Sequence, residues 1–254
     1  MRLIKWDNLP PEMQTDEVKK YYDILVKKKT ALFFKRAFDI VVSSFMLLFL
    51  LPVFIILAIA IKLDSPGPVF YRQERVTQYG RKFFIHKFRT MVQNADKGSQ
   101  VTINNDCRIT GVGKVIRDCR LDEIAQLLDI LSGNMTFCAT RAEASKYVEQ
   151  YSPEMMATLL LPAGVTSLAS ILYKDEAKLL DGANDPDKVY IENILPTKMY
   201  YNLESLENFS FWGDIRLMFM TVFAVCGKEY KGDYIPNTKN TDDVDIEVQQ
   251  IMEE

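Results

Sequence analysis

The strongest constraint on this chain is a run of 22 residues, 40–61, that carries no charge and is bounded by Asp39 and Lys62. As an α-helix the run would be about 33 Å long, comparable to the roughly 30 Å hydrocarbon core of a bilayer. Pro52 lies just past its middle, where a proline removes a backbone donor and kinks or breaks a helix. The run therefore predicts a membrane segment that is interrupted at Pro52.

The residues around this segment do not assign it a direction across the membrane. Both flanks are basic: Lys27, Lys28, Lys29, Lys35 and Arg36 precede it, and Lys62, Arg72, Arg75, Arg81 and Lys82 follow it. Because basic flanks stay on the cytoplasmic side, a re-entrant helix that bends near Pro52 and returns fits both of them. Composition alone leaves an ordinary single span equally open, with a buried core helix as a third alternative.

Two more segments have the character of surface helices. Within residues 17–29, apolar side chains recur at helical spacing beside five lysines, which predicts a helix on an anionic membrane surface. Residues 215–225 follow Trp212 and are apolar apart from Arg216 and Thr221. They are too few to span a bilayer, so they predict either an interfacial helix anchored by Trp212 or a core helix.

Composition excludes several classes of protein. With 48% hydrophobic residues, the chain is not a disordered one. The single histidine, His86, excludes His-based triads and multi-His metal sites, and four cysteines without a Cys-x-x-Cys exclude a zinc ribbon. The net charge of −3 is unevenly distributed: residues 62–120 have a net charge of +7, and residues 121–231 have a net charge of −7. This asymmetry indicates an anion-binding half, and the apolar segment beside it argues against nucleic acid as the ligand.

Beyond the membrane segment, short strands and cations are expected. A turn signal at residues 64–68 ends any helix, and residues 69–71 and 82–86 read as strands separated by a turn at Gly80. Lys87 and Arg89 are two residues apart, so on a strand they would share a face and could bind a phosphate together. Paired cations are equally typical of a solvated surface.

The clearest helix is predicted over residues 121–131, with one apolar stripe and with Asp122 and Glu123 in its first turn. Acidic residues are favourable there through the helix macrodipole without any chemistry. Arg117 and Arg141 lie close by in the sequence. Carboxylates among guanidinium groups can instead stay ionised, hold a divalent cation and face a phosphate-bearing substrate.

Short motifs follow one another in a characteristic order. They are Lys35-Arg36-Ala37-Phe38-Asp39, Ser65-Pro66-Gly67-Pro68-Val69-Phe70, Gln73-Glu74-Arg75-Val76, Phe84-Ile85-His86-Lys87-Phe88-Arg89-Thr90-Met91, Leu121-Asp122-Glu123 and Gly133-Asn134-Met135. Together with the proline-interrupted segment, they resemble the bacterial sugar transferase family, the monotopic polyprenyl-phosphate phosphoglycosyl transferases. The resemblance runs from about Lys35 to about Gly227.

This resemblance implies an enzyme on the cytoplasmic face of the bacterial inner membrane. It would transfer a sugar-1-phosphate from a nucleotide sugar, usually a UDP-sugar, to undecaprenyl phosphate and release UMP, as the first membrane step of surface glycan synthesis. Asp122 would form a covalent phosphosugar intermediate, and Glu123 with Asp122 would hold Mg²⁺. The residues expected to bind substrate are Arg75, Lys87, Arg89, Arg117 and Arg141.

The chain departs from the family pattern near these residues. Arg120 stands where the family usually has serine or threonine, and residues 139–142 keep only Arg141 of the usual Gly-Pro-Arg-Pro turn. A membrane-anchored scaffold or a catalytically weakened relative is therefore the alternative function. The identity of the sugar and the oligomeric state, a homodimer included, stay open.

The expected architecture is a helix-rich α+β domain with a short strand pair. We predict a basic amphipathic region at residues 1–39, a Pro-kinked re-entrant helix at 40–61 and a cytosolic catalytic domain at 62–231. The acidic residues 232–254 are expected to form a solvated, flexible tail.

Overall fold

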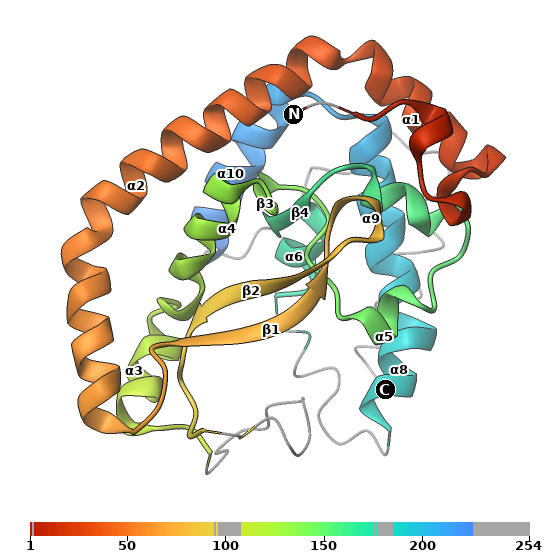
Figure 1. The fold of residues 1–254 in the computed structure, drawn as a ribbon. Helices are drawn as coiled ribbons and strands as arrows, with labels where there is room; N and C mark the ends of the chain where they lie inside the picture. Colours follow the sequence, from red (N-terminus) through yellow and green to blue (C-terminus); the bar gives the residue numbers. More distant parts are fainter. Residues whose placement is uncertain (2, 94, 96–107, 175, 177–184, 226–254) are drawn as a thin grey trace.

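The structure is a computed structural model that describes residues 1, 3–93, 95, 108–174, 176 and 185–225 (Figure 1). The predicted acidic tail at residues 232–254 lies outside the described residues. The described part has the expected helix-rich α+β character. Its longer helices are α1 (Asp16–Lys27), α2 (Lys29–Asp64), α3 (Gly111–Asp118), α4 (Leu127–Ser132), α9 (Leu195–Glu207) and α10 (Phe211–Val225). The shorter ones are α5 (Ser145–Val148), α6 (Leu168–Leu172) and α8 (Pro186–Val189).

The strands form two small sheets. β1 (Phe70–Val76) and β2 (Lys82–Phe88) are antiparallel, with Phe70 opposite Phe88, and the predicted turn at Gly80 has a positive φ of 73°. This strand pair confirms the expectation. A second sheet, in which β3 (Met135–Cys138) runs parallel to β4 (Ala163–Thr166), was not predicted. Its strands have four residues each, which is too short for a periodic signal.

Helix α2 is longer than the uncharged run and continues through both of its predicted boundaries, 39/40 and 61/62. It contains Pro52 and has the length and composition of a membrane-spanning helix. Figure 1 shows α2 as an arc along one side of the molecule. Its outward face is apolar and exposed; examples are Phe34, Val41, Phe45, Leu48, Phe49, Leu51, Ile56 and Leu63.

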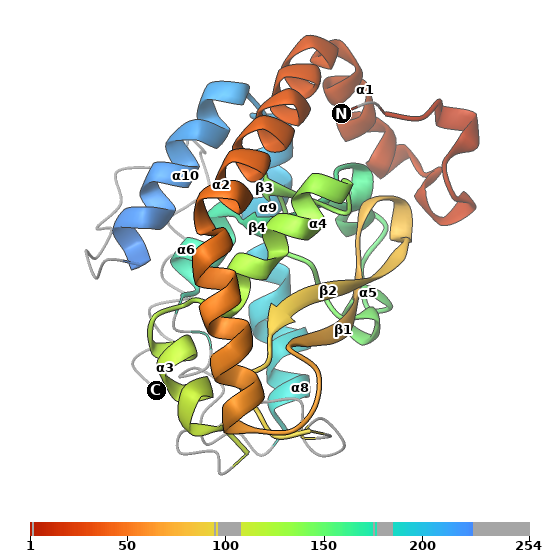
Figure 2. The same ribbon diagram turned by 60° about the vertical axis from the view of Figure 1, so that its left-hand side comes forward.

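The inward face of α2 packs on the rest of the domain along its length. Met46, Leu47 and Leu50 contact a core cluster that includes Phe83 and Ile130. Further along the helix, Val53, Phe54, Leu57 and Ile61 pack in a cluster with Phe88 and Ile116. In the turned view, α2 crosses the front of the molecule between α4 and α10 (Figure 2). One face of the helix therefore packs on the domain, and the other is exposed in the part of the chain that the structure describes.

Polar contacts fix the N-terminal part of α2. Lys35, only 3% exposed, donates to the Cys138 carbonyl at 2.6 Å and pairs with the Asp214 carboxylate of α10 at 2.5 Å. One turn further on, Asp39 accepts from the Thr136 hydroxyl at 2.8 Å. Arg36 donates to the Ile130 carbonyl of α4 at 2.7 Å. These bonds join α2 to β3, α4 and α10.

The C-terminal end of α2 is held by the same domain. The Arg89 guanidinium donates to the carbonyls of Ser65 and Pro66, each at 2.7 Å, just past the end of the helix. The Asp64 carboxylate accepts from the backbone N–H of Val112 in α3 at 2.9 Å. Both ends of the apolar helix are thus bonded to one folded unit.

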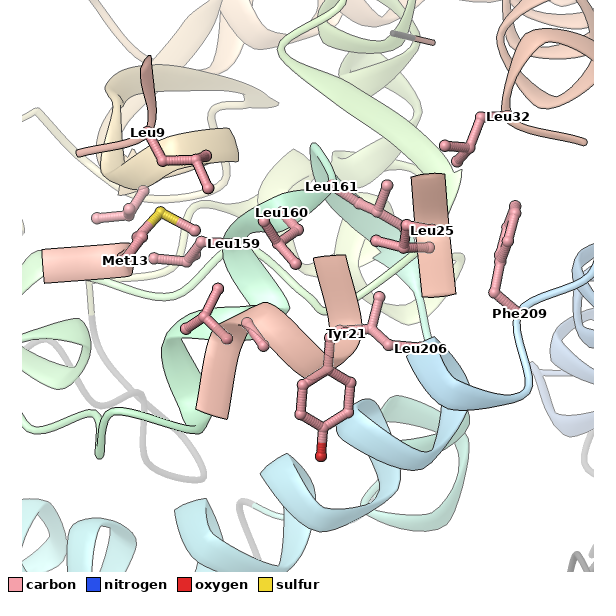
Figure 3. Packing of buried hydrophobic residues seen from close by; sticks show 13 residues of the cluster. Leu9, Met13, Tyr21, Leu25, Leu32, Leu159, Leu160, Leu161, Leu206 and Phe209 are labelled. Atoms are coloured by element: carbon pink, nitrogen blue, oxygen red, sulfur yellow. The ribbon is translucent and has the colours of Figure 1, made fainter. Parts of the chain in front are cut away.

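The helix predicted within residues 17–29 is present as α1, and its apolar face belongs to the largest core cluster of the described residues. On α1, Val18, Tyr21 and Leu25 are each 3% exposed or less and pack with Leu160 and Leu206, as Figure 3 shows for the labelled members. The apolar face of α1 is therefore part of the protein core and is not free to contact lipid. Helical periodicity indicates that one face of a helix is apolar, but not what covers it.

Helix α10 combines the two alternatives that its sequence left open. Met220 is buried in a small cluster with Leu168 and Ile171 of α6. On the outside, Trp212 is 76% exposed and Phe219 is 63% exposed. One face of α10 is core and the other is an exposed apolar surface.

We expect Lys35→Met to destabilise the fold, because it removes a buried cation and leaves the half-buried Asp214 carboxylate without its partner. Removing one partner of a buried ion pair costs about 3–5 kcal/mol. Thermal unfolding of purified protein in detergent should show a clearly lower midpoint. Adding Asp214→Asn to this variant should recover part of the loss. Lys188→Met, which removes an exposed pair with Glu192, is the control and should leave the midpoint nearly unchanged; equal midpoints for all variants would contradict this account.

Candidate active site

Asp122 and Glu123 lie at the start of a short 3₁₀ helix, Asp122–Gln126, which leads into α4 at Leu127. The predicted single helix over residues 121–131 is therefore divided into a 3₁₀ turn and an α-helix. The division follows from the sharp entry into this segment. Arg120 has a left-handed backbone (φ 55°), and the Leu121 N–H returns to the Ile116 carbonyl of α3 at 2.8 Å. The two carboxylates thus follow a tight turn at the end of α3.

Glu123 is held between two cations. Its carboxylate accepts from the Lys87 ammonium of β2 at 3.0 Å and from the Arg141 guanidinium. Burial by itself would raise the pKa of Glu123, but Arg141 and Lys87 together bring that pKa well below its ordinary 4.5. Arg141 is in turn fixed by a bond to the Val165 carbonyl of β4 at 2.9 Å. The two cations therefore favour the ionised form of Glu123 and fix the position of its carboxylate.

Asp122 has the opposite electrostatic environment. Burial, and then the negative charge of Glu123, raise the pKa of Asp122 above its ordinary value, and Lys87 and Arg117 offset only part of that rise. A raised pKa makes the ionised carboxylate a stronger base. Adjacent carboxylates whose pKa values are moved apart by their surroundings are typical of sites where the two groups have different chemical roles.

A cavity of about 790 Å³ opens beside Asp122. Of the sequence-predicted residues, it is lined by Asp122, Arg75, Lys87, Arg117 and Arg141. Glu123 lies behind them, bonded to Lys87 and Arg141. Arg117 also donates to the Thr90 hydroxyl at 2.8 Å, which fixes its guanidinium near Asp122. The predicted carboxylate pair and four of the five predicted cations therefore meet at one site.

Arg89 lies on an adjoining cavity of about 540 Å³, which Lys87, Arg117 and Asp122 also line. Its guanidinium is bonded to the end of α2, whereas Lys87 is bonded to Glu123. Joint binding of a phosphate by Lys87 and Arg89 stays a prediction. Arg89 links the apolar helix to the strand that carries Lys87.

Sequence reasoning missed a polar cluster on the same cavity. Glu143 accepts from the Tyr190 phenol at 2.7 Å, and the Lys198 ammonium donates to Tyr190 at 2.9 Å and to Glu176 at 2.8 Å. Glu143, Tyr190 and Lys198 are each less than 9% exposed. Tyr190 lies within the span of the family resemblance, but no role was predicted for it. The position of Glu143, two residues after Arg141, was a sequence signal that could have placed it near the site. Glu176 and Lys198 are distant in the sequence and reach the cavity only through tertiary folding.

Asp122 and Glu123 are also the residues suited to a divalent cation. Among the described residues, no group of three or more His, Cys, Asp or Glu side chains is placed to hold a metal ion. Mg²⁺ is commonly bound by only one or two carboxylates together with water and substrate phosphates. The donor set of the pair therefore fits Mg²⁺ that binds jointly with a phosphate substrate.

Comparison with known proteins identifies the family of this chain. Residues 30–228 match the family described as bacterial sugar transferase. The chain is 34% identical over 197 residues to a UDP-N-acetylgalactosamine-undecaprenyl-phosphate N-acetylgalactosaminephosphotransferase of Aeromonas hydrophila, an alignment covering 76% of this chain and 44% of that protein. It is also 34% identical over 196 residues to a UDP-glucose:undecaprenyl-phosphate glucose-1-phosphate transferase of Klebsiella pneumoniae, covering 75% and 39%.

A shorter relative is covered almost completely. The chain is 35% identical over 199 residues to the exopolysaccharide production protein PSS of Rhizobium leguminosarum bv. phaseoli, covering 75% of this chain and 94% of that protein. By contrast, the chain spans less than half the length of the Aeromonas and Klebsiella relatives.

Because the pKa of Glu123 is depressed in the folded protein, its ion pairs contribute stability above pH 4.5 that is lost as pH falls. Glu123→Gln should therefore lower the unfolding midpoint at pH 7, and its difference from the unmodified protein should narrow at acidic pH. Thermal unfolding at several pH values measures this. Glu192→Gln, on an exposed pair, is the control and should change little at any pH. A Glu123→Gln difference that widens on acidification would contradict the ion-pair account.

Proposed function

The chain belongs to the bacterial sugar transferase family, and on that premise we propose that it transfers a sugar-1-phosphate from a UDP-sugar to undecaprenyl phosphate and releases UMP. The observation that carries this proposal is the half-buried Asp122–Glu123 pair, whose pKa values are shifted in opposite directions beside a cavity lined by Arg75, Lys87, Arg117 and Arg141. The names of the Aeromonas and Klebsiella relatives supply the substrate class.

In the first step, the Asp122 carboxylate attacks the sugar-bearing phosphorus of the donor. A carboxylate–phosphorus bond forms, the bond from that phosphorus to the bridging oxygen breaks, and UMP leaves with the electron pair. Two features of the site support this role. Its raised pKa makes the Asp122 carboxylate a better nucleophile. The cations of Arg117, Lys87 and Arg141 offset the charge of the two approaching anions.

In the second step, a phosphate oxygen of the lipid acceptor attacks the same phosphorus and restores the free Asp122 carboxylate. The products are UMP and a lipid-linked sugar diphosphate, and no net proton is gained or lost. Division into two steps means that the two anionic substrates never need to react directly with each other.

Asp122 and Glu123 would hold Mg²⁺ together with the donor phosphates. When bound, the ion would neutralise charge on the transferring phosphoryl group. Glu123 suits this role because Lys87 and Arg141 keep its carboxylate ionised and fixed. Asp122 would contact the ion as well, and its raised pKa suits its carboxylate to the additional role of nucleophile.

We further propose that α2 is a re-entrant helix bent near Pro52, with both ends on the cytoplasmic side of the bacterial inner membrane. The arc of α2 in Figure 1 supports this, as do the bonds from both of its ends to one domain. If α2 crossed a bilayer, α3 and α4 would sit at opposite faces. The charged groups between them, Asp122 and Glu123 included, would then lie at the depth of the hydrocarbon, which is costly.

The exposed apolar surfaces support a membrane site at the depth of the headgroups. The outward face of α2 and the outer face of α10, with Trp212 exposed, are both apolar. Trp side chains favour the membrane interface. A surface of this kind would hold the catalytic pair where the phosphate of the lipid acceptor resides.

A donor-only incubation tests the mechanism. With a UDP-sugar and Mg²⁺ but no acceptor, we expect a burst of UMP and a phosphosugar mass added to the peptide that contains Asp122. Asp122→Asn should abolish both, a loss of at least about 10³-fold in turnover, because the amide is a far weaker nucleophile. Rapid-quench intact-mass spectrometry and a UMP assay make the measurement.

Three results would contradict parts of this proposal. Turnover without any adduct would mean direct transfer between donor and acceptor. Turnover retained in Asp122→Asn would remove the assigned nucleophile. No UMP release across a broad panel of UDP-sugars, with the acceptor present, would instead favour a scaffold role for the chain.

A further inference from the structure

A third cavity, of about 660 Å³, meets the catalytic pair from the side of the apolar helices. Its walls include Met46 of α2 and Thr221 and Ala224 of α10, and they extend inward to Glu123 and Arg141. The apolar lining comes from Leu121, Ile124, Leu127, Ile130, Phe137, Val165 and Ile171. The cavity thus runs from the two helices with exposed apolar faces to the charged residues of the site.

Arg120 stands where this cavity and the 790 Å³ cavity meet, since it lines both of them. Its backbone is left-handed (φ 55°), and the N–H groups of Arg120 and Leu121 close the end of α3 onto the carbonyls of Arg117 and Ile116. At this position of a helix C-terminus, glycine or asparagine is the ordinary residue, because other side chains strain the backbone. The turn itself therefore does not explain an arginine here.

The Arg120 side chain is exposed, and within the described part of the chain its guanidinium has no ion-pair partner. Two other cations of the same cavity are already paired: Arg141 with Glu123, and Lys198 with Glu143 and Glu176. Strained backbone at a binding site is typical of a residue whose side chain is needed there. Arg120 thus has a strained backbone, and its guanidinium has no ion pair among the described residues. It lies two positions before Asp122.

We propose that Arg120 binds the phosphate of the polyprenyl acceptor at the inner end of the 660 Å³ cavity, with the apolar chain leaving between α2 and α10. The inference rests on the proposed function and adds to it the residue and the route used by the second substrate. An arginine matches a phosphate with charge-assisted, bidentate hydrogen bonds. The apolar lining matches an isoprenoid chain, whereas the donor has no apolar part that would require it.

Adduct formation from the donor and transfer to the acceptor can be measured separately, which distinguishes acceptor binding by Arg120 from nucleophilic attack by Asp122. In Arg120→Asn, the asparagine tolerates the left-handed backbone, so the variant should fold with an unchanged unfolding midpoint. Donor-only adduct formation and its UMP burst should stay within about twofold of the unmodified protein. Transfer to polyprenyl phosphate should fall about 10- to 100-fold in kcat/KM for the acceptor, which is the scale of losing a charged hydrogen bond. Arg120→Lys should recover part of the loss.

Lys114→Asn is the matched control. It makes the same change of charge on the exposed side of α3 and lines none of the described cavities at the site. It should leave both half-reactions unchanged. If it lowered acceptor use as much as Arg120→Asn, a general loss of positive charge at the membrane surface would explain the effect and the proposal would be wrong.

Cys119 gives a readout that needs no turnover, because this exposed thiol lines the same cavity beside Arg120. Vesicles that contain polyprenyl phosphate should slow alkylation of Cys119, as followed by peptide mass spectrometry, whereas plain vesicles or inorganic phosphate alone should not. In Arg120→Asn this protection should be lost.

The outcomes distinguish a failure of the proposed function from a failure of the proposed acceptor site. Failure of adduct formation in the unmodified protein counts against the proposed function, whereas Cys119 protection in that same sample would still support the acceptor site. If Arg120→Asn instead slowed adduct formation and left acceptor use intact, Arg120 would belong to the donor site and the proposal would be overturned. Equal protection of Cys119 with and without Arg120 would also overturn it.

Discussion

The rest of the structure depends on one constraint: the apolar helix α2 is bonded to the same domain at both ends. Lys35 and Arg36 fix one end to β3, α4 and α10, and Arg89 and Asp64 fix the other to β2 and α3. The proposed catalytic pair lies between these attachments. Because ionised groups are costly in hydrocarbon, these attachments support the proposed re-entrant topology over a crossing that would take the site into the lipid. In the proposed topology the outward face of α2 enters the membrane while the site stays in water.

The site gives two adjacent carboxylates different electrostatic environments. Glu123 has two bonded cations, and their charges outweigh its burial, so its pKa falls. The pKa of Asp122 is raised by burial and by Glu123 itself. The difference depends on strands far apart in the sequence, since Lys87 comes from β2 and Arg141 is positioned by β4. The sequence motif supplies the pair, and the tertiary fold supplies the difference on which the two proposed roles rest.

Part of the fold and of the candidate site was predictable from local sequence signals. The uncharged run, the turn at Gly80 and the strand pair have strong local signals, and the motif order identified the family and the Asp122–Glu123 pair. What the sequence did not show depended on tertiary packing. The apolar face of α1 is covered by protein, the Arg89 guanidinium is bonded to the end of α2, and Glu176 and Lys198 reach the cavity only through folding. The left-handed Arg120 could not be foreseen either, because arginine carries no local signal for that conformation.

The most direct test of the central claim is a depth profile of α2 in lipid vesicles. Spin labels placed one at a time at Phe34, Leu51 and Leu63, all on the exposed face, report their depth through collisions with oxygen and with a water-soluble relaxant. A helix that enters and returns predicts the greatest depth at Leu51, near Pro52, with Phe34 and Leu63 both shallow and both reached by a relaxant added on the cytoplasmic side only. Labels at Phe34 and Leu63 that are accessible from opposite sides of the membrane would contradict the account.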